Sequence, residues 1–183
     1  MSGSIEVIVG CMFSGKSEEL IRRLKRLSYT KKSIIVFKPV IDKRWNRRNE
    51  LVSRSGTAFA AYPVLTPIEM REKGSAYDIV AIDEAHFFVQ SFITVIEDLR
   101  DAGKQVLIAG LDLDFRREPF EHMARVLALA DSVVKLDAVC VLCGCRATLT
   151  QRLINGQPAP RNAERIMVGD EEYQARCRAC HVV

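Results

Sequence analysis

The stretch GCMFSGKS, residues 10–17, constrains the fold of this chain more than any other feature. It matches G-x-x-x-x-G-K-[ST], the pattern of a loop that wraps phosphate groups. An apolar run at 5–9 precedes it and a helical pattern at 18–29 follows it, which predicts a strand, a glycine loop and a helix in succession. Lys16 would supply charge to the β/γ-phosphates and Ser17 a hydroxyl to Mg²⁺. A plain glycine turn between core elements is the alternative.

The composition is that of an ordinary globular protein. The 183 residues suffice for one core, or for one core with a small appendage. Hydrophobic residues make up 48% and charged residues 27%, and no apolar run approaches the length that spans a membrane. The N-terminus lacks the basic region and the cleavage site of a signal peptide, so we expect a cytoplasmic protein.

Charge is distributed unevenly along the chain. Residues 1–60 hold 13 Lys or Arg against 5 Asp or Glu, whereas the remainder is net acidic. A basic N-terminal portion suits a polyanion such as a nucleotide or a nucleic acid. A solvated helix face and a charged loop would produce the same pattern.

Up to residue 139 the chain alternates between apolar runs typical of buried strands and amphipathic patterns typical of helices. Such alternation predicts an α/β fold with helices on both faces of a parallel sheet. We expect strands at 5–9, 33–37, 59–64, 77–82, 105–109 and 131–139, and helices at 18–29, 67–73, 88–102 and 118–130. Residues 42–56 are charged and lack periodicity, so we expect a mobile loop there.

A change in composition marks the last part of the chain. After residue 139 cysteines appear, helical periodicity fades and turn signals such as Asn155-Gly156 accumulate. We therefore expect a phosphate-loop domain at 1–139 and a smaller domain at 140–183. Because no flexible linker separates the two parts, the second should pack on the first.

The tetrapeptide DEAH at 83–86 follows an apolar strand pattern, at a strand end where ligands of parallel sheets bind. In phosphate-loop enzymes an Asp at the place of Asp83 holds Mg²⁺. Glu84 beside it could accept a proton from an attacking hydroxyl. The letters DEAH also occur in helicases, which makes an ATP-driven nucleic-acid motor a rival hypothesis. Such motors need two nucleotide-binding-type domains, however, and residues 1–139 make only one.

Four of the six cysteines form two C-x-x-C pairs that are separated by 33 residues. In a chain without an export signal, such pairs favour a metal over disulfides. Four sulfur ligands suit a structural tetrahedral Zn²⁺ site with no open position for catalysis. The predicted ligands are Cys140, Cys143, Cys177 and Cys180. We interpret the neighbouring Cys145 and His181 as bystanders, and Cys11 in the phosphate loop as a spectator.

Several aromatic side chains near these motifs are candidates for stacking on a base, although aromatic residues more often belong to a core. They are Phe13, Phe87, Phe88, Phe115, Phe120 and Tyr173.

Together the motifs resemble those of one family, the type II (cellular) thymidine kinases. The matching stretches are GCMFSGKSEELIRRLKR, IDEAHFF, AGLDLDFRREPF, VVKLDAVCVLC, ATLTQRL and IMVGDEEYQARCRAC, in the family's order over essentially the whole chain. The resemblance implies a RecA-like phosphate-loop domain with a central parallel sheet, and a small C-terminal zinc-binding domain with a lasso loop over the nucleoside. It implies transfer of the ATP γ-phosphoryl group to the 5′-hydroxyl of thymidine, with Mg²⁺ accompanying ATP.

The resemblance also assigns roles to residues. It implies Glu84 as the catalytic base and Ser17 and Asp83 as the magnesium side. The ATP-binding residues that it implies are Gly10, Cys11, Met12, Phe13, Ser14, Gly15, Lys16, Ser17, Asp42, Arg44, Asp83, Glu84, Ala85 and His86. The thymidine-binding residues that it implies are Met12, Phe87, Leu111, Phe115, Phe120, Thr150, Ile166, Met167, Val168, Gly169 and Tyr173. It further implies a homotetramer inhibited by the triphosphate end product, with no nucleic-acid or membrane partner.

Two departures from the family pattern stand out. His86 occupies a place where the family commonly has Gln, and the lasso sequence at 168–170 is rearranged. His86 could alter the ATP side of the site or its pH response, and the lasso change could shift the backbone donors that bind the base. Neither departure removes a group that the reaction needs. A non-catalytic zinc-binding adaptor remains a third hypothesis, to be kept only if ATP and nucleosides both fail to bind.

Overall fold

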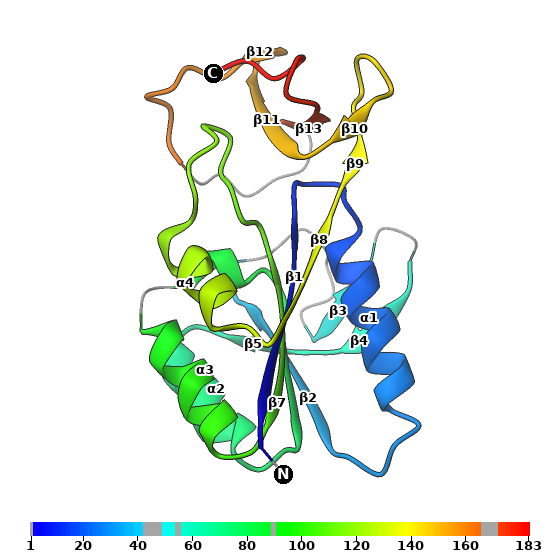
Figure 1. Ribbon diagram of the computed structural model, residues 1–183, viewed down its shortest axis with the longest axis vertical. Coiled ribbons are helices and arrows are strands. Elements are labelled where there is room, and N and C mark those ends of the chain that lie inside the picture. Colours follow the sequence, from blue (N-terminus) through cyan, green and yellow to red (C-terminus); the bar gives the residue numbers. More distant parts are fainter. Residues whose placement is uncertain (1, 42–48, 54–55, 89–90, 166–171) are drawn as a thin grey trace.

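A six-stranded sheet forms the centre of the protein. The computed structural model describes residues 2–41, 49–53, 56–88, 91–165 and 172–183 (Figure 1). The sheet has the order β5-β2-β6-β7-β1-β8, and every neighbouring pair is parallel. Its strands are β1 (Ser4–Gly10), β2 (Ile34–Pro39), β5 (Tyr62–Val64), β6 (Ile79–Ile82), β7 (Gln105–Gly110) and β8 (Ser132–Leu136). Central strands β6 and β7 are buried because both faces of the sheet are covered.

Helices cover both faces of this sheet, which confirms the predicted α/β fold. They are α1 (Lys16–Leu27), α2 (Pro67–Gly74), α3 (Phe92–Asp101) and α4 (Glu121–Leu129), with a short 3-10 helix η1 (Ala85–Phe87). Leu20 and Leu24 of α1 pack on one face. Met70 of α2, Phe92 of α3 and Met123 of α4 lie in the core on the other face. Figure 1 shows α1 in blue on one side and the other three helices, in green, on the opposite side.

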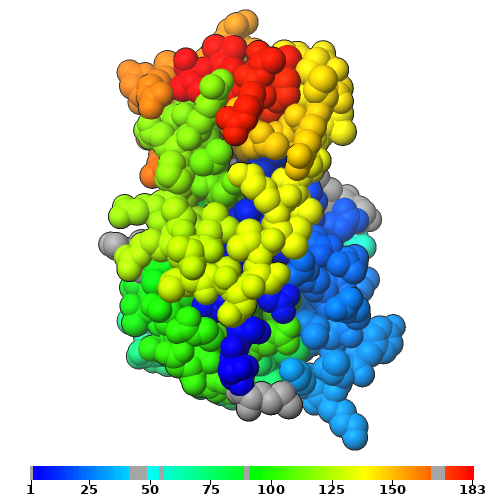
Figure 2. Space-filling model, in the orientation of Figure 1, coloured from blue at the N-terminus to red at the C-terminus, as the bar shows by residue number. Residues whose placement is uncertain are grey.

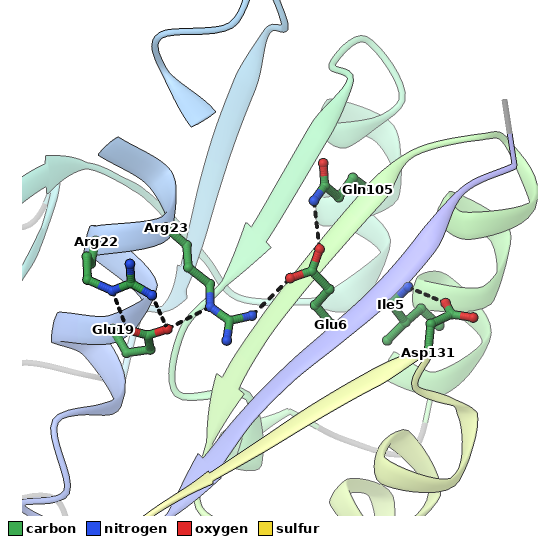
Figure 3. Close-up of polar contacts among 7 residues, drawn as sticks. All are labelled: Ile5, Glu6, Glu19, Arg22, Arg23, Gln105 and Asp131. Atoms are coloured by element: carbon green, nitrogen blue, oxygen red, sulfur yellow. Dashed lines mark hydrogen bonds and ion pairs between the residues drawn. The ribbon is translucent and has the colours of Figure 1, made fainter. Parts of the chain in front are cut away.

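A network of charged side chains ties α1 to the sheet (Figure 3). Glu19 accepts hydrogen bonds from Arg22 and Arg23, and Arg23 Nη1 also donates to Glu6 Oε2 of β1 at 2.9 Å. Gln105 Nε2 of β7 donates to the other Glu6 oxygen at 2.7 Å. The hydrogen bond from Arg22, followed by that from Arg23, lowers the pKa of Glu19 to about 2. These contacts hold the helix that follows the phosphate loop against the two strands below it.

Part of the stretch expected to be a mobile loop is a hairpin. The described residues of 42–56 include β3 (Glu50–Val52), which pairs antiparallel with β4 (Ala58–Ala60). The prediction of a loop is wrong for this segment, because Leu51 is buried in the same apolar cluster as the α1 side chains. The strand predicted at 59–64 divides between β4 and β5, and only β5 joins the large sheet.

Other predicted elements shift at their ends. Helix α1 begins at Lys16 and ends at Leu27, α3 begins at Phe92 after η1, and α4 begins at Glu121. The strand predicted at 131–139 divides into β8 and β9 (Ala138–Val139). Strand β2 extends to Pro39, two residues beyond the predicted end.

Two small antiparallel sheets form the C-terminal part, at the top of Figure 1. One pairs β9 with β10 (Arg146–Ala147), and the other has the order β12-β11-β13. Their strands are β11 (Leu149–Ile154), β12 (Gln157–Pro158) and β13 (Tyr173–Arg176). Asn155 and Gly156 join β11 to β12, both with positive φ (52° and 77°). That backbone suits a two-residue hairpin turn, which confirms the turn predicted there.

In the part of the chain that the structure describes, no helix has the length and apolar character needed to cross a bilayer.

Candidate active site

The loop 10–17 joins β1 to α1 as predicted. Gly10 has φ 153°, and a Cβ atom there would lie 2.5 Å from the carbonyl oxygen of Leu136, so a side chain cannot be accommodated. Gly15 caps α1 in the left-handed region at φ 82°. Phe13 also has positive φ (67°), and its side chain is exposed. The glycines therefore stand where the backbone path and the close approach to β8 demand them.

Polar side chains of this loop point inward. Lys16 is buried, and its Nζ donates to the carbonyl oxygen of Cys11 at 2.8 Å, folding the ammonium group over the loop. Ser14 Oγ donates to the same oxygen. Ser17 Oγ donates to Asp83 Oδ2 at 2.8 Å. The two residues predicted on the magnesium side are thus brought together from α1 and from the end of β6.

The carboxyl end of β6 holds two buried carboxylates. Asp83 and Glu84 follow the strand directly and are 2% and 6% exposed. Glu84 has φ 52°, a left-handed conformation that costs a residue with a side chain on the order of 1 kcal/mol. Oxygen donors such as Ser17 and Asp83 are the kind that Mg²⁺ prefers, so their chemistry fits that ion.

His86 lies between Glu84 and the end of β7. The backbone N–H of Leu111 donates to His86 Nδ1 at 3.2 Å, so that nitrogen is an acceptor and carries no proton in this bond. Glu84 Oε2 lies 3.5 Å from the same nitrogen. The rings of Phe87 and Phe120 flank the imidazole at centroid distances of 4.2 and 5.2 Å. His86, which departs from the family pattern, is therefore buried between the Glu84 carboxylate and the residues predicted to bind the nucleoside.

The residues predicted to bind thymidine lie near the same end of the sheet. Phe115, Phe120 and Thr150 are buried, and Met12, Phe87, Leu111 and Tyr173 are partly buried. The backbone N–H of Met12 donates to Thr150 Oγ1 at 3.0 Å, which joins the phosphate loop to β11. By contrast, Phe88 stacks on Phe92 in the core, so its role is structural.

Six of the predicted site residues lie outside the part of the chain that the structure describes, and two others are buried without an evident role in binding. Asp42, Arg44, Ile166, Met167, Val168 and Gly169 lie outside the described residues. Ala85, the first residue of η1, is buried in the core. Cys11 is buried, with its thiol 3.4 Å from the carbonyl oxygen of Ala147, and burial raises the pKa of that thiol. A raised pKa makes Cys11 a poor nucleophile, which agrees with its interpretation as a spectator.

Asp114 organises the loop after β7, a feature that the sequence did not predict. Its side chain is 0% exposed, and Oδ1 accepts the backbone N–H groups of Arg116 and Glu118, both at 2.9 Å. Oδ2 accepts from Arg165 Nε at 2.8 Å, and the Arg165 guanidinium lies over the Phe120 ring. An Asp in a turn is a known signal for such side-chain-to-backbone bonds. Asp114 thus fixes the segment that carries Phe115 and Phe120.

The four cysteines of the two C-x-x-C pairs converge in the C-terminal part, where Cys140 and Cys177 share a buried cluster with Cys11 of the phosphate loop. Their sulfur atoms all lie within 4.8 Å of one another, and those of Cys143 and Cys177 are 3.6 Å apart. A tetrahedron with Zn–S bonds of ~2.3 Å has edges of about 3.8 Å, so the geometry fits the predicted zinc site. Cys145 and His181 are not members of this cluster, in agreement with their exclusion as ligands.

Backbone hydrogen bonds favour the thiolate form at one cysteine of each C-x-x-C pair. Backbone N–H groups, that of Cys177 first, lower the pKa of the Cys140 thiol to about 6. Bonds of the same kind, that from Cys180 first, lower the pKa of Cys177. Hydrogen bonds with neighbouring cysteine sulfurs raise the pKa of the other two thiols, those of Cys143 and Cys180. Since the thiolate is the form that binds metal, one cysteine of each pair favours that form before a cation binds.

Comparison with known proteins identifies a family and a similar fold. The family model described as thymidine kinase matches residues 3–181, nearly the whole chain. Among solved structures, the flagellar accessory protein FlaH from Methanocaldococcus jannaschii is similar, with a TM-score of 0.53 and 14% identity. The similarity covers 79% of this chain and 75% of that one. At so low an identity it concerns the fold alone.

Proposed function

This chain belongs to the thymidine kinase family, and on that premise we propose that it transfers the γ-phosphoryl group of ATP to the 5′-hydroxyl of thymidine. The product would be thymidine monophosphate, made by salvage of a deoxynucleoside. The observation that carries the proposal is the meeting of Lys16, the Ser17–Asp83 pair and Glu84 at the carboxyl end of one parallel sheet. Phosphoryl transfer needs little beyond in-line positioning and charge neutralisation, and this arrangement can supply both.

Each group has a distinct task in this proposal. The N–H groups of the loop 10–17 and the ammonium of Lys16 bind the phosphates, and Lys16 exchanges its bond to Cys11 for a phosphate oxygen. Ser17 and Asp83 hold Mg²⁺, which would neutralise charge on the β- and γ-phosphates when bound. Glu84 accepts the proton of the attacking hydroxyl.

The nucleoside would lie between the loop after β7 and β11. Phe115 and Phe120 supply flat apolar surface, and Leu111, Met12 and Thr150 border it. Shape and a few hydrogen bonds must then select thymine over larger bases. Asp42 and Arg44, and the backbone of 166–169, are proposed to complete the phosphate and base contacts.

Further properties of the proposal come from the family, for the tetramer, and from the sequence patterns, for the location and the domains. We propose a homotetramer in the cytoplasm, with a phosphate-loop domain at 1–139 and a zinc-binding domain at 140–183. Sedimentation of the purified protein with and without nucleotide would test the tetramer directly, because a monomer would sediment far more slowly.

The substitution Glu84→Gln tests the proposed reaction. Gln keeps the shape and one acceptor but cannot take a proton, so kcat should fall about a hundredfold or more. Thymidine affinity should change less than about threefold, because the lost interaction belongs to the transition state. The assay follows thymidine monophosphate by chromatography, with thymidine titrated calorimetrically. Glu97→Gln on α3, a partly exposed surface carboxylate, is the control and should behave like the wild type.

Two outcomes would contradict the proposal. If the wild type forms no thymidine monophosphate from ATP and thymidine, the proposed reaction is wrong. If Glu84→Gln retains more than about a tenth of wild-type kcat, Glu84 is not the base.

A further inference from the structure

A buried chain of hydrogen bonds runs from the cysteine cluster to the phosphate loop, and His181 stands at its centre. Arg117 Nε donates to His181 Nδ1 at 3.1 Å, and His181 Nε2 lies 3.1 Å from the carbonyl oxygen of Thr150. Thr150 Oγ1 in turn accepts the backbone N–H of Met12 at 3.0 Å. His181 is only 5% exposed, so its ring bonds are shielded from water.

The partners of the ring determine its tautomer. A guanidinium group can only donate, so the nitrogen facing Arg117 must be an unprotonated acceptor. A carbonyl oxygen can only accept, so the nitrogen facing Thr150 must carry the proton. Neutral His181 with its proton on Nε2 satisfies both bonds, and the opposite tautomer would satisfy neither.

The backbone of His181 is anchored independently of its ring. Its N–H donates to the carbonyl oxygen of Cys177 at 3.0 Å, within the second cysteine knuckle. Its carbonyl oxygen accepts from Arg117 Nη2 at 2.7 Å. The next residue, Val182, exchanges two hydrogen bonds with the side-chain amide of buried Gln151. The knuckle therefore sets where the imidazole lies, and the imidazole touches two other parts of the molecule.

Those two parts are the borders of the proposed nucleoside pocket. Arg117 belongs to the loop after β7, which carries Phe115 and Phe120, and Thr150 belongs to β11. Figures 1 and 2 show this loop, in yellow-green, rising to meet the C-terminal segment, in red. The ring thus connects, across 31 and 64 residues of sequence, segments that must keep a fixed separation to bind a base.

We propose that His181 is a positioning residue for the nucleoside. Its ring keeps Thr150 and the loop that carries Arg117 at a fixed separation, and its backbone is anchored in the cysteine cluster, so the cluster stabilises the shape of the pocket. This inference rests on the proposed function. It assigns the imidazole no metal ligation and no chemical step. Its effect is on nucleoside binding, and ATP, which the loop 10–17 holds on the other side of Met12, should be affected much less.

Three substitutions distinguish the hydrogen bond at His181 Nδ1 from that at Nε2. His181→Phe fills the space but removes both nitrogens. His181→Gln places an amide N–H near the position of Nε2 and can keep the bond to Thr150. His181→Asn places an amide oxygen near the position of Nδ1 and can keep the bond to Arg117. Arg178→Gln, at an exposed position of the same segment, is the control.

Steady-state kinetics should distinguish positioning from a general structural role. For His181→Phe we expect KM for thymidine to rise about tenfold, the effect of leaving one or two buried polar groups without their partner. KM for ATP and kcat should change less than about threefold, and zinc content, by elemental analysis, should stay that of the wild type. His181→Gln and His181→Asn should each recover part of the loss, and Arg178→Gln should match the wild type.

Nuclear magnetic resonance tests the geometry separately from activity. In protein labelled with ¹⁵N at histidine, the signals missing from His181→Phe should be those of a neutral ring protonated at Nε2. The Nδ1-protonated tautomer, a loss of zinc in His181→Phe, or equal changes in both KM values would overturn the inference. A wild type that has the expected tautomer but does not phosphorylate thymidine would contradict the proposed function, and with it the role given to His181.

Discussion

Replacing Asp114 with Asn should loosen the proposed nucleoside pocket without touching the reacting groups. In the wild type Oδ1 accepts two backbone N–H groups and Oδ2 accepts from Arg165. Asn can keep the first pair of bonds with its carbonyl oxygen. Its NH₂ group then faces the Arg165 N–H, donor against donor, and the charge attraction is lost.

The expected loss of stability follows from how deeply Asp114 and Arg165 are each buried. Breaking a buried ion pair costs about 3–5 kcal/mol. Asp114 is 0% exposed but Arg165 is 39% exposed, so water can take up part of what the arginine loses. We therefore expect a loss of about 2 kcal/mol, in the range of one charged hydrogen bond. For a chain of this size that corresponds to a melting temperature lower by about 4–8 °C.

Two assays measure this change. Thermal unfolding gives the loss of stability, and thymidine kinetics should show KM raised several-fold with kcat nearly unchanged, since Phe115 and Phe120 lie on the loosened loop. Asp114→Ala also removes both turn acceptors and should cost about 2 kcal/mol more. Asp101→Asn is the control, because that carboxylate is exposed and its pair with Arg100 contributes little.

The result that would refute this reasoning is a melting temperature of Asp114→Asn within about 1 °C of that of Asp101→Asn. A second contradiction would be an unchanged KM for thymidine in a variant that is clearly destabilised. In that case the loop would be stabilised by Asp114 but would not border the nucleoside.

Two further predictions concern the metal and the helix network. Removing metal with a strong chelator should unfold the C-terminal sheets, because structural zinc contributes folding free energy directly. Thymidine should then no longer raise the melting temperature, whereas ATP still should. Fully active protein that elemental analysis finds free of zinc would contradict this prediction. Glu19→Gln should cost about 1 kcal/mol at pH 7, well below the ~3.4 kcal/mol that a pKa shift from 4.5 to about 2 would imply without solvent screening. The lowered pKa makes this stabilisation complete above pH 4.5, so the difference from the wild type should narrow as the pH falls toward 2 in denaturant titrations, and a difference independent of pH would show that Glu19 acts through packing.

The parts of the fold that the sequence predicts well are those with local physical signatures. The loop 10–17 needs glycine at two backbone positions, and it stands between a strand and a helix as expected. Each C-x-x-C pair is a local metal-binding signature, so the sequence predicts that the two pairs meet although 33 residues separate them. The turn at 155–156 follows from the tolerance of Asn and Gly for positive φ.

The misses are contacts that depend on distant parts of the chain. The hairpin β3–β4 forms where a charged stretch suggested a loop, because Leu51 finds an apolar surface on α1 that only the fold creates. The sequence suggests no role for His181 beyond that of a bystander beside the cysteines, because its partners Arg117 and Thr150 lie 64 and 31 residues away. Sequence spacing carries no sign of such pairs. The domain boundary at 139 and the roles of the site residues stay predictions.

The two halves of the cysteine cluster also have a consequence for chain length. A metal shared by Cys143 and Cys177 would close a loop that contains the whole β11–β12 hairpin. The entropy lost on closing a flexible loop rises only with the logarithm of its length, about 0.6 kcal/mol for each doubling. The tip of that hairpin, at Asn155-Gly156, is exposed and makes no demand on the metal. Extra residues inserted there, even a short peptide tag, should therefore change neither metal binding by the cysteines nor the proposed nucleoside pocket.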